Sequence, residues 1–281
     1  MINQEDNKRE DNKRAELGKE VWNDWANGEL NKHEDKRAGV DFSGAILPKM
    51  DFSGFIFPGR ADFTNVTFNG EALFEGAKFK GDARFEGAMF KGFADFEGAT
   101  FEGKARFEGA TFESVANFTG ATFGNWTYFE RSTFGSLAYF TCATFKSMTN
   151  FNNATFENVT SFIYATFKSA PGFHNAAIHQ DTAFSFGEDF FKQFPDTKSE
   201  HSERAYRTLK MAMNKHQAHT EEAGFFKLEL KARAKKEARY RAWMYGAYGL
   251  LSNYGQSVSK PLIWWAGLGV AMFFLYFSIS G

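Results

Sequence analysis

Cysteine is almost absent from this chain of 281 residues, which contains a single thiol, Cys142. One cysteine excludes an internal disulfide framework. No apolar segment near the start has the form of a signal peptide. We therefore expect the chain to occupy a reducing compartment.

The sequence also lacks the motifs of the common catalytic sites. It has no glycine-rich nucleotide-binding loop, no paired cysteines and no nucleophile elbow. His216 and His219 lie three residues apart on a predicted helix, but a third metal ligand is not in view. Cys142 has no basic neighbour in sequence that would activate its thiol. We therefore predict a protein that is not an enzyme, with no catalytic, cofactor-binding or metal-binding residues.

Phenylalanine, in contrast, is abundant and regularly spaced. One series of Phe runs from Phe52 to Phe184 and occupies every eleventh position, and a second series with the same period runs from Phe57 to Phe167. Together the two series hold 24 of the 36 Phe residues. A small residue stands two positions before most of them, so the unit alternates between A-x-F-x-x and A-x-F-x-x-x.

This spacing predicts an all-β solenoid. Neither an α-helix nor a flat strand places residues five and six apart on one face. In a solenoid, each turn of chain sends Ala and Phe inward onto the same residues of the next turn. Neighbouring turns pair their backbones at about 4.8 Å, and each buried ring contributes roughly 1.5–3 kcal/mol. Such an array is stabilised by stacking, because no single repeat can build a core.

Tandem units such as FEGAKFKGDARF resemble the pentapeptide-repeat family, in particular its Phe-rich, membrane-associated bacterial branch. The resemblance covers about residues 41–186 and implies a right-handed quadrilateral β-helix with four units per coil. The extra residue in every second unit departs from the family pattern. It implies about 22 residues per coil instead of about 20, and about six or seven coils.

The extra residues recur at every eleventh position, so they alternate between two opposite corners of the coil. One corner carries Phe93, Val115, Leu137 and Val159, and the other carries Asp82, Lys104, Trp126 and Met148. These side chains either tuck into a widened corner or form an exposed apolar ridge, and contiguous exposed apolar surface usually marks an interface. The candidate interaction ridge consists of Phe93, Val115, Leu137, Val159, Trp126 and Met148.

Residues 1–40 form a charged N-terminal segment that ends in a helical pattern, with Trp22 and Trp25 on one face. An open solenoid end exposes rings and unpaired strand edges. We therefore expect a capping helix that lays both indoles over the first coil. Residues 41–190 form the β-helix, with Pro48 and Pro58 at corners where no ladder N–H is needed.

Residues 191–243 predict two amphipathic helices, at about 200–217 and 220–243. The first carries an apolar face of Tyr206, Leu209 and Met213, and the second one of Phe226, Leu230 and Ala234.

Residues 244–261 are rich in Tyr and Gly and are interpreted as a segment at a membrane interface, including Tyr254. Residues 262–281 predict one transmembrane helix, because this apolar stretch carries no charge. Trp264 and Trp265 suit the membrane interface, and Gly267 and Ala271 are spaced for helix packing. Basic residues precede this helix, so we expect the repeat domain to face the cytoplasm. The resemblance to the membrane-associated bacterial branch implies the bacterial inner membrane.

Three functions remain open. The first is a membrane-tethered scaffold that presents its solenoid to a protein partner or to copies of itself. The second is the cytoplasmic domain of an oligomeric, ion-channel-like membrane protein, of which this chain would be a truncated form. The third is a DNA mimic that inhibits a topoisomerase, as the resemblance implies for acidic members. Residues 41–190 carry 11 Lys and Arg against 17 Asp and Glu, a mixed field that imitates phosphates poorly.

The expected partners follow from these functions. They are the lipid bilayer, through residues 262–281, and either further copies of the chain or an unidentified protein. No nucleic acid and no cofactor is expected.

Overall fold

A computed structural model describes residues 4–185, 187–236, 246–250, 259 and 263. The chain divides into two compact units, Met1–Asp196 and Thr197–Gly281. The first unit contains the repeats and the helices at their two ends. The second unit contains a pair of helices.

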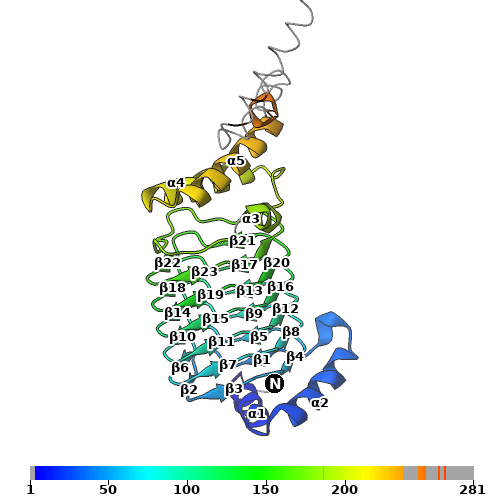
Figure 1. The fold of residues 1–281 in the computed structure, drawn as a ribbon. Coiled ribbons are helices and arrows are strands. Elements are labelled where there is room, and N and C mark those ends of the chain that lie inside the picture. Colours follow the sequence, from blue (N-terminus) through cyan, green and yellow to red (C-terminus); the bar gives the residue numbers. More distant parts are fainter. Residues whose placement is uncertain (1–3, 186, 237–245, 251–258, 260–262, 264–281) are drawn as a thin grey trace, which may run out of the picture. The chain divides into compact units, whose positions relative to one another are not determined.

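The repeats form a four-sided solenoid of the right-handed type, in which each side is a parallel sheet of six two-residue strands (Figure 1). Face A contains β1 (Val40–Asp41), β5 (Ala61–Asp62), β9 (Ala83–Arg84), β13 (Ala105–Arg106), β17 (Thr127–Tyr128) and β21 (Thr149–Asn150). Face B contains β2 (Ile46–Leu47), β6 (Thr67–Phe68), β10 (Met89–Phe90), β14 (Thr111–Phe112), β18 (Thr133–Phe134) and β22 (Thr155–Phe156). Face C contains β3 (Met50–Asp51), β7 (Ala72–Leu73), β11 (Ala94–Asp95), β15 (Ala116–Asn117), β19 (Ala138–Tyr139) and β23 (Thr160–Ser161). Face D contains β4 (Ile56–Phe57), β8 (Lys78–Phe79), β12 (Thr100–Phe101), β16 (Thr122–Phe123), β20 (Thr144–Phe145) and β24 (Thr166–Phe167).

The register of the strands confirms the predicted length of the coil. Ala83 on face A lies opposite Ala105, and Thr100 on face D lies opposite Thr122. The chain visits faces A, B, C and D in turn. The corners between successive faces are named below by their two faces, as in the D–A corner.

Phe rings fill the interior of the solenoid. Phe74 stacks on Phe96 of the next coil with 4.8 Å between ring centroids and 1° between ring planes. Rings of different columns meet edge to face instead, as Phe96 and Phe107 do at 87°, and this geometry suits the ring quadrupole. Every ring of the two predicted series is buried, which confirms that both point inward.

The direction of the ladder hydrogen bonds explains where three of the prolines stand. N–H groups on face A donate to the following coil, whereas those on faces B and D donate to the preceding one. In the first coil, Pro48 and Pro58 occupy the positions of Asn69 and Lys80, whose N–H groups bond to the preceding coil. Pro171 stands on face A at the other end, one coil beyond Thr149. Each proline thus removes a donor that the end of the array would leave unpaired.

Helix α2 (Lys19–Leu30) caps the first coil and confirms the predicted role of Trp22. The indole of Trp22 is fully buried against Phe42, Phe55 and Phe57 and donates its N–H to the carbonyl of Ile56 at 2.7 Å. The side-chain amide of Asn23 pairs with the same edge, since it accepts the N–H of Ile56 and donates to the carbonyl of Gly54. A side chain here takes the place of a neighbouring strand.

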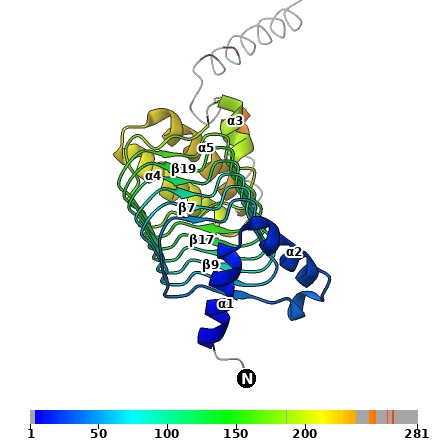
Figure 2. The ribbon, with the colours of Figure 1, turned by 90° about the horizontal axis from the view of Figure 1, so that it is seen from below.

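The expectation that Trp25 also covers the first coil needs correction. Trp25 is half-buried, meets Trp22 edge to face, and lies under the guanidinium of Arg14 from helix α1 (Gln4–Glu16). Residues three apart on a helix diverge by about 60°, so only one of the two indoles can face the coil squarely. Figure 2 shows α1 and α2 beside the first coil, and a short 3₁₀ turn, η1 (Glu34–Lys36), follows α2.

Helix α3 (Gly187–Gln193) closes the other end of the solenoid. Phe194, just after this helix, stacks on Phe167 at 5.5 Å and 2°, and so continues a column whose next repeat position lacks Phe. The Gln193 side chain donates to the carbonyl of Phe162 and accepts the N–H of Ser185. Both ends of the core are therefore covered by residues of the same unit.

The second unit contains α4 (Ser202–Lys215) and α5 (His219–Lys236), which agree with the two predicted helices up to Lys236. The rest of the second predicted helix, 237–243, lies outside the described residues. Tyr206, Leu209 and Met213 are buried on α4, which confirms its apolar face. The predicted face of α5 is only partly right. Leu230 is buried, but Phe226 and Ala234 are half-buried, and burial extends instead to Phe225, Leu228 and Ala232. A helix that is buried on more than one side does not show a single apolar stripe.

A buried carboxylate joins the two helices of this unit. Glu229 of α5 accepts hydrogen bonds from Arg207 and Lys210 of α4 and from Arg233. Burial by itself would raise the pKa of Glu229, but the hydrogen bonds from Lys210 and Arg207 lower it overall. The charge is buried because it is fully paired.

The predicted membrane residues lie outside the described part of the chain. These are Tyr254, Trp264, Trp265, Gly267 and Ala271. Within the described ranges, no helix has both the length and the apolar character needed to cross a bilayer.

Candidate interaction surface

The predicted ridge residues occupy two opposite corners of the solenoid. Phe93, Val115, Leu137 and Val159 line the B–C corner, one per coil, and all four are half-buried. Their exposure lies between the two interpretations left open by the sequence, because each side chain is neither enclosed nor fully projecting. The corner therefore presents a continuous but shallow apolar edge.

The D–A corner is more exposed. The side chains of Trp126 and Met148 are 44% and 36% accessible. The Lys104 ammonium lies 5.8 Å from the centre of the Trp126 ring, and Tyr128 on face A meets the same ring edge to face at 6.3 Å. The guanidinium of Arg106 lies over Tyr128 at 5.3 Å. Trp, Tyr and Arg are the residues most enriched at the energetic centres of protein interfaces.

The repeats provide an internal control for this corner. The position of Trp126 is occupied by Asp82, Lys104 and Met148 in other coils, so the fold itself does not require an aromatic ring there. The position of Tyr128 is likewise held by Arg84, Arg106 or Asn150. Trp126 is exposed and Tyr128 is half-buried. Two aromatic rings at positions with no packing requirement point to a role outside the core.

Face A carries a ladder of alternating charge below this aromatic pair. Arg84 contacts Asp62 and Glu86, and Arg106 lies 3.7 Å from Glu108. Burial raises the pKa of the Glu108 carboxyl, whose Oε2 atom is enclosed without a hydrogen-bond partner. This ladder neutralises itself within the chain and leaves little net charge for a partner.

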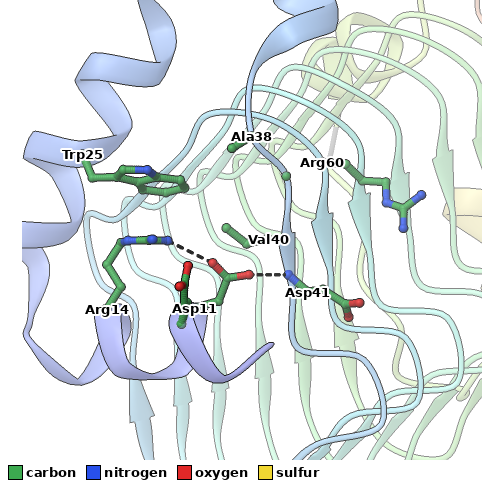
Figure 3. A pocket seen from close by; sticks show the side chains of 9 residues that line it. Asp11, Arg14, Trp25, Ala38, Val40, Asp41 and Arg60 are labelled. Carbon is green, nitrogen blue, oxygen red and sulfur yellow. Dashed lines mark hydrogen bonds and ion pairs between the residues drawn. The ribbon is translucent and has the colours of Figure 1, made fainter. Parts of the chain in front are cut away.

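A pocket of about 440 Å³ lies between α1, α2 and the first coil (Figure 3). Asp11 accepts the N–H of Asp41 at the edge of face A and also bonds to Arg14, which lies over Trp25. Burial raises the pKa of the Asp11 carboxyl, although these bonds oppose the shift. Asp11 and Arg14 are bonded within the cap and to the edge of face A, so these two residues are explained by the cap itself.

A second hollow, of about 660 Å³, follows the lower D–A corner beside Gly59, Gly81 and Gly103. A Cβ atom added to Gly81 would lie 2.5 Å from the carbonyl carbon of Gly59. The glycines are therefore required by the close approach of successive coils.

The sequence reasoning did not single out Arg131 and Tyr164, which are exposed in the later coils, and it considered Cys142 only for its thiol. Arg131, Cys142 and Tyr164 have φ angles of 57–58°, where the corresponding corners of earlier coils carry Gly or Asn. A left-handed backbone is unfavourable for such residues. Comparing each position with its equivalents one coil away would have revealed them, because they break the repeat only on the outside.

No chemical centre is formed by the candidates that the sequence analysis considered. His216 ends α4 and His219 begins α5, and across the described residues no group of three His, Cys, Asp or Glu side chains is placed to hold a metal. Cys142 is exposed at the C–D corner.

Comparison with known proteins identifies the repeats. A family model described as pentapeptide repeats, nine copies long, matches residues 52–100 and 96–144. Neither the curated proteins nor the solved structures gave a match.

Proposed function

The chain belongs to the pentapeptide-repeat family through residues 52–144, and from this premise we propose that it is a non-enzymatic scaffold. Its rigid solenoid presents lateral surfaces for protein–protein interaction or self-assembly. The proposal includes a membrane tether at residues 262–281 in the bacterial inner membrane, with the repeats facing the cytoplasm.

The observation that carries the proposal is a closed core with specialised corners. Buried Phe rings occupy the whole interior, and α2 and α3 cover its two ends. End-to-end stacking of cores is thereby blocked, and the four faces and their corners are the surface available to partners. Among these, the D–A corner with Trp126, Tyr128 and Met148 has the composition of an interface centre.

The tether is supported by sequence chemistry. Residues 262–281 carry no charged side chain, and about 20 apolar residues suffice to span a hydrocarbon core. Trp264 and Trp265 fall where indoles favour the interface, and Tyr254 precedes them. Gly267 and Ala271 would allow close packing of two such helices.

The first experiment compares molecular masses by light scattering. The full chain is solubilised in detergent or nanodiscs, and residues 1–196 are measured alone, with circular dichroism as a check that the solenoid has formed. A defined oligomer of the full chain beside a monomeric short form would assign assembly to residues 197–281. The same oligomer in both forms would assign it to the solenoid.

Two further outcomes address the scaffold and the tether separately. Monomers in both forms would leave a foreign protein as the partner, and Trp126→Ala should then weaken capture of that protein. Full chain that stays monodisperse without detergent and does not enter nanodiscs would overturn the tether but not the scaffold.

A further inference from the structure

Face D changes character along the solenoid. Residues 75–82 and 97–104, which form this face and its corners in two earlier coils, contain four acidic residues, Glu75, Asp82, Glu97 and Glu102. The equivalent residues 119–126, 141–148 and 163–170 contain none and carry Lys146 and Lys168. The later part of face D, together with Lys104 below Trp126, is named the lysine–aromatic patch. Its members are Lys104, Trp126, Cys142, Lys146, Met148, Tyr164 and Lys168.

The lysines of this patch are not neutralised within the described chain. Lys146 and Lys168 are exposed, and neither forms an ion pair with a described carboxylate. The Lys104 ammonium lies near the Trp126 ring and forms no ion pair with a described carboxylate, although the Lys104 backbone N–H donates to Asp82. Of the other solenoid lysines, Lys49 pairs with Glu71 and Lys80 with Glu102, whereas Lys78 and Lys91 are exposed without an ion pair to a described carboxylate. The patch is therefore a local positive surface on a rod of net negative charge.

Large side chains stand at both edges of the patch. Trp126 and Met148 project from the D–A corner, and Tyr164, 61% exposed, projects from the C–D corner. Tyr164 adopts φ of 57° at a corner where Gly98 and Gly120 stand in earlier coils. A bulky residue in this backbone conformation costs stability, so its exposed ring has no explanation in the fold.

The surface between these edges is flat. Thr122, Thr144 and Thr166 follow one another in register across three coils, spaced by about 4.8 Å. All three are half-buried, so none rises above the sheet. A flat face with lysines and with aromatic side chains at its margins can meet a plane along its whole length.

We propose that the lysine–aromatic patch docks on the surface of an anionic lipid bilayer. Lysines next to a membrane are attracted to anionic headgroups, and Trp and Tyr rings favour the headgroup layer. The flat shape of face D favours a plane over a nucleic acid that wraps the rod, because Thr122, Thr144 and Thr166 lie in register on one face.

Stable attachment to the bilayer requires the membrane tether at residues 262–281, so this inference rests on the proposed function. Each lysine near an anionic surface strengthens binding by about fivefold, and three lysines alone give weak attachment. Stable attachment to membranes generally takes two signals. Residues 262–281 would supply the first signal and the patch the second, which would lay face D along the bilayer and leave the other faces free for proteins.

The single thiol of the chain offers a direct probe. Cys142 is exposed at the edge of the patch, and no other cysteine competes for a label. The full chain, labelled at Cys142 with a fluorophore, is placed in nanodiscs of phosphatidylcholine alone or with phosphatidylserine. Quenching by aqueous iodide is compared with quenching by a nitroxide on the lipid headgroups. Docking predicts headgroup quenching and iodide protection only with the anionic lipid, both lost at high salt.

Matched variants separate the patch from overall charge. Lys146→Glu changes the charge by two units, so it should lower the ratio of docked to free protein by about 25-fold. Lys91→Glu makes the same change of charge at an exposed lysine on face B and should leave the ratio within about twofold. Trp126→Ala removes a ring from a position that also accepts Asp82 and Lys104, so it should reduce headgroup quenching without unfolding the coil.

Each outcome has a defined meaning. Equal quenching in neutral and anionic nanodiscs, or equal effects of Lys146→Glu and Lys91→Glu, would overturn the proposal. Protection by added single-stranded DNA in place of anionic lipid would overturn it in favour of nucleic acid. If the chain does not enter nanodiscs, the tether fails instead. The labelled protein is then added to phosphatidylserine vesicles, where headgroup quenching that Lys146→Glu abolishes would still support the patch and its absence would overturn it.

Discussion

Each interior ring is held by rings above, below and beside it. Phe112 stacks between Phe90 at 4.7 Å and Phe134 at 4.9 Å, and meets Phe118 edge to face. Removing such a ring leaves a cavity that the neighbouring coils cannot fill, because their backbones are tied in register. The interior residues therefore carry the stability of the array.

Phe112→Ala should lower the free energy of unfolding by about 3–5 kcal/mol. Glu113→Ala changes the next residue, which is exposed on the outside of the same coil, and should cost less than about 0.5 kcal/mol. Denaturant unfolding of both variants measures the difference. Similar losses would show that the ring of Phe112 does not point inward.

Replacing Glu108 should raise the free energy of unfolding, whereas replacing Phe112 should lower it. Burial raises its pKa above the ordinary value of 4.5, so the folded protein holds the proton more tightly than the unfolded chain. Ionisation therefore lowers stability as the pH rises above 4.5. Glu108→Gln carries no charge and should unfold with a higher free energy at neutral pH, and this advantage should shrink as the pH falls toward 4.5.

Urea unfolding at several pH values tests this expectation, with Glu113→Gln as the exposed control. A loss of stability in Glu108→Gln at neutral pH would mean that the contact of Glu108 with Arg106 outweighs the cost of burial.

At the scale of elements, the caps at α2 and α3 place rings and hydrogen-bonding groups where a further coil would place its own. Trp22 and Phe194 supply rings at the ends of the columns, and Asn23 and Gln193 supply side-chain amides to exposed strand edges. Pro48, Pro58 and Pro171 remove donors that no cap reaches. The edge donors of Ile56 and Ser185 are thus covered by side-chain amides and three others are replaced by proline, which opposes edge-to-edge aggregation.

Asn23→Ala should cost about 1–3 kcal/mol, because it leaves the N–H of Ile56 and the carbonyl of Gly54 without partners. The loss should be local to the first coil. Hydrogen exchange of residues 54–57 should accelerate, while that of the central coils stays unchanged. Asp24→Ala, on the exposed side of the same helix, is the control, and equal exchange in the two variants would show that Asn23 does not cap the edge.

At the scale of the whole molecule, the length of one coil sets what can be removed. Deletion of 94–115 joins Phe93 to Ala116 and removes one complete coil, since Ala94 and Ala116 occupy equivalent positions. The shortened protein should keep its β-sheet circular dichroism and unfold cooperatively. Repeat arrays tolerate such changes because each repeat contacts only its neighbours.

Deletion of 94–117 removes the next strand as well and is the matched comparison. It should abolish cooperative unfolding, because Phe93 is then joined directly to Phe118. The coil lacks the two-residue strand β15 (Ala116–Asn117) and loses its register. Equal stability of the two deletions, measured by thermal denaturation, would mean that the coils are not in fixed register.

The sequence by itself determined the solenoid, its inward columns and its coil length, because Phe at every eleventh position has no other regular way to be buried. It also indicated the role of Trp22, since an open end of such a core must be covered. The sequence did not determine how far the corner residues are exposed. Phe93 and Trp126 hold equivalent extra positions in the sequence, yet one is half-buried and the other 44% exposed. The exposure of a side chain depends on the neighbouring faces. The same is true of ion pairing, since Lys49 and Lys80 have carboxylate partners and Lys146 has none among the described residues. Those neighbours belong to the next coil along the chain, and only the stacking of coils brings them together.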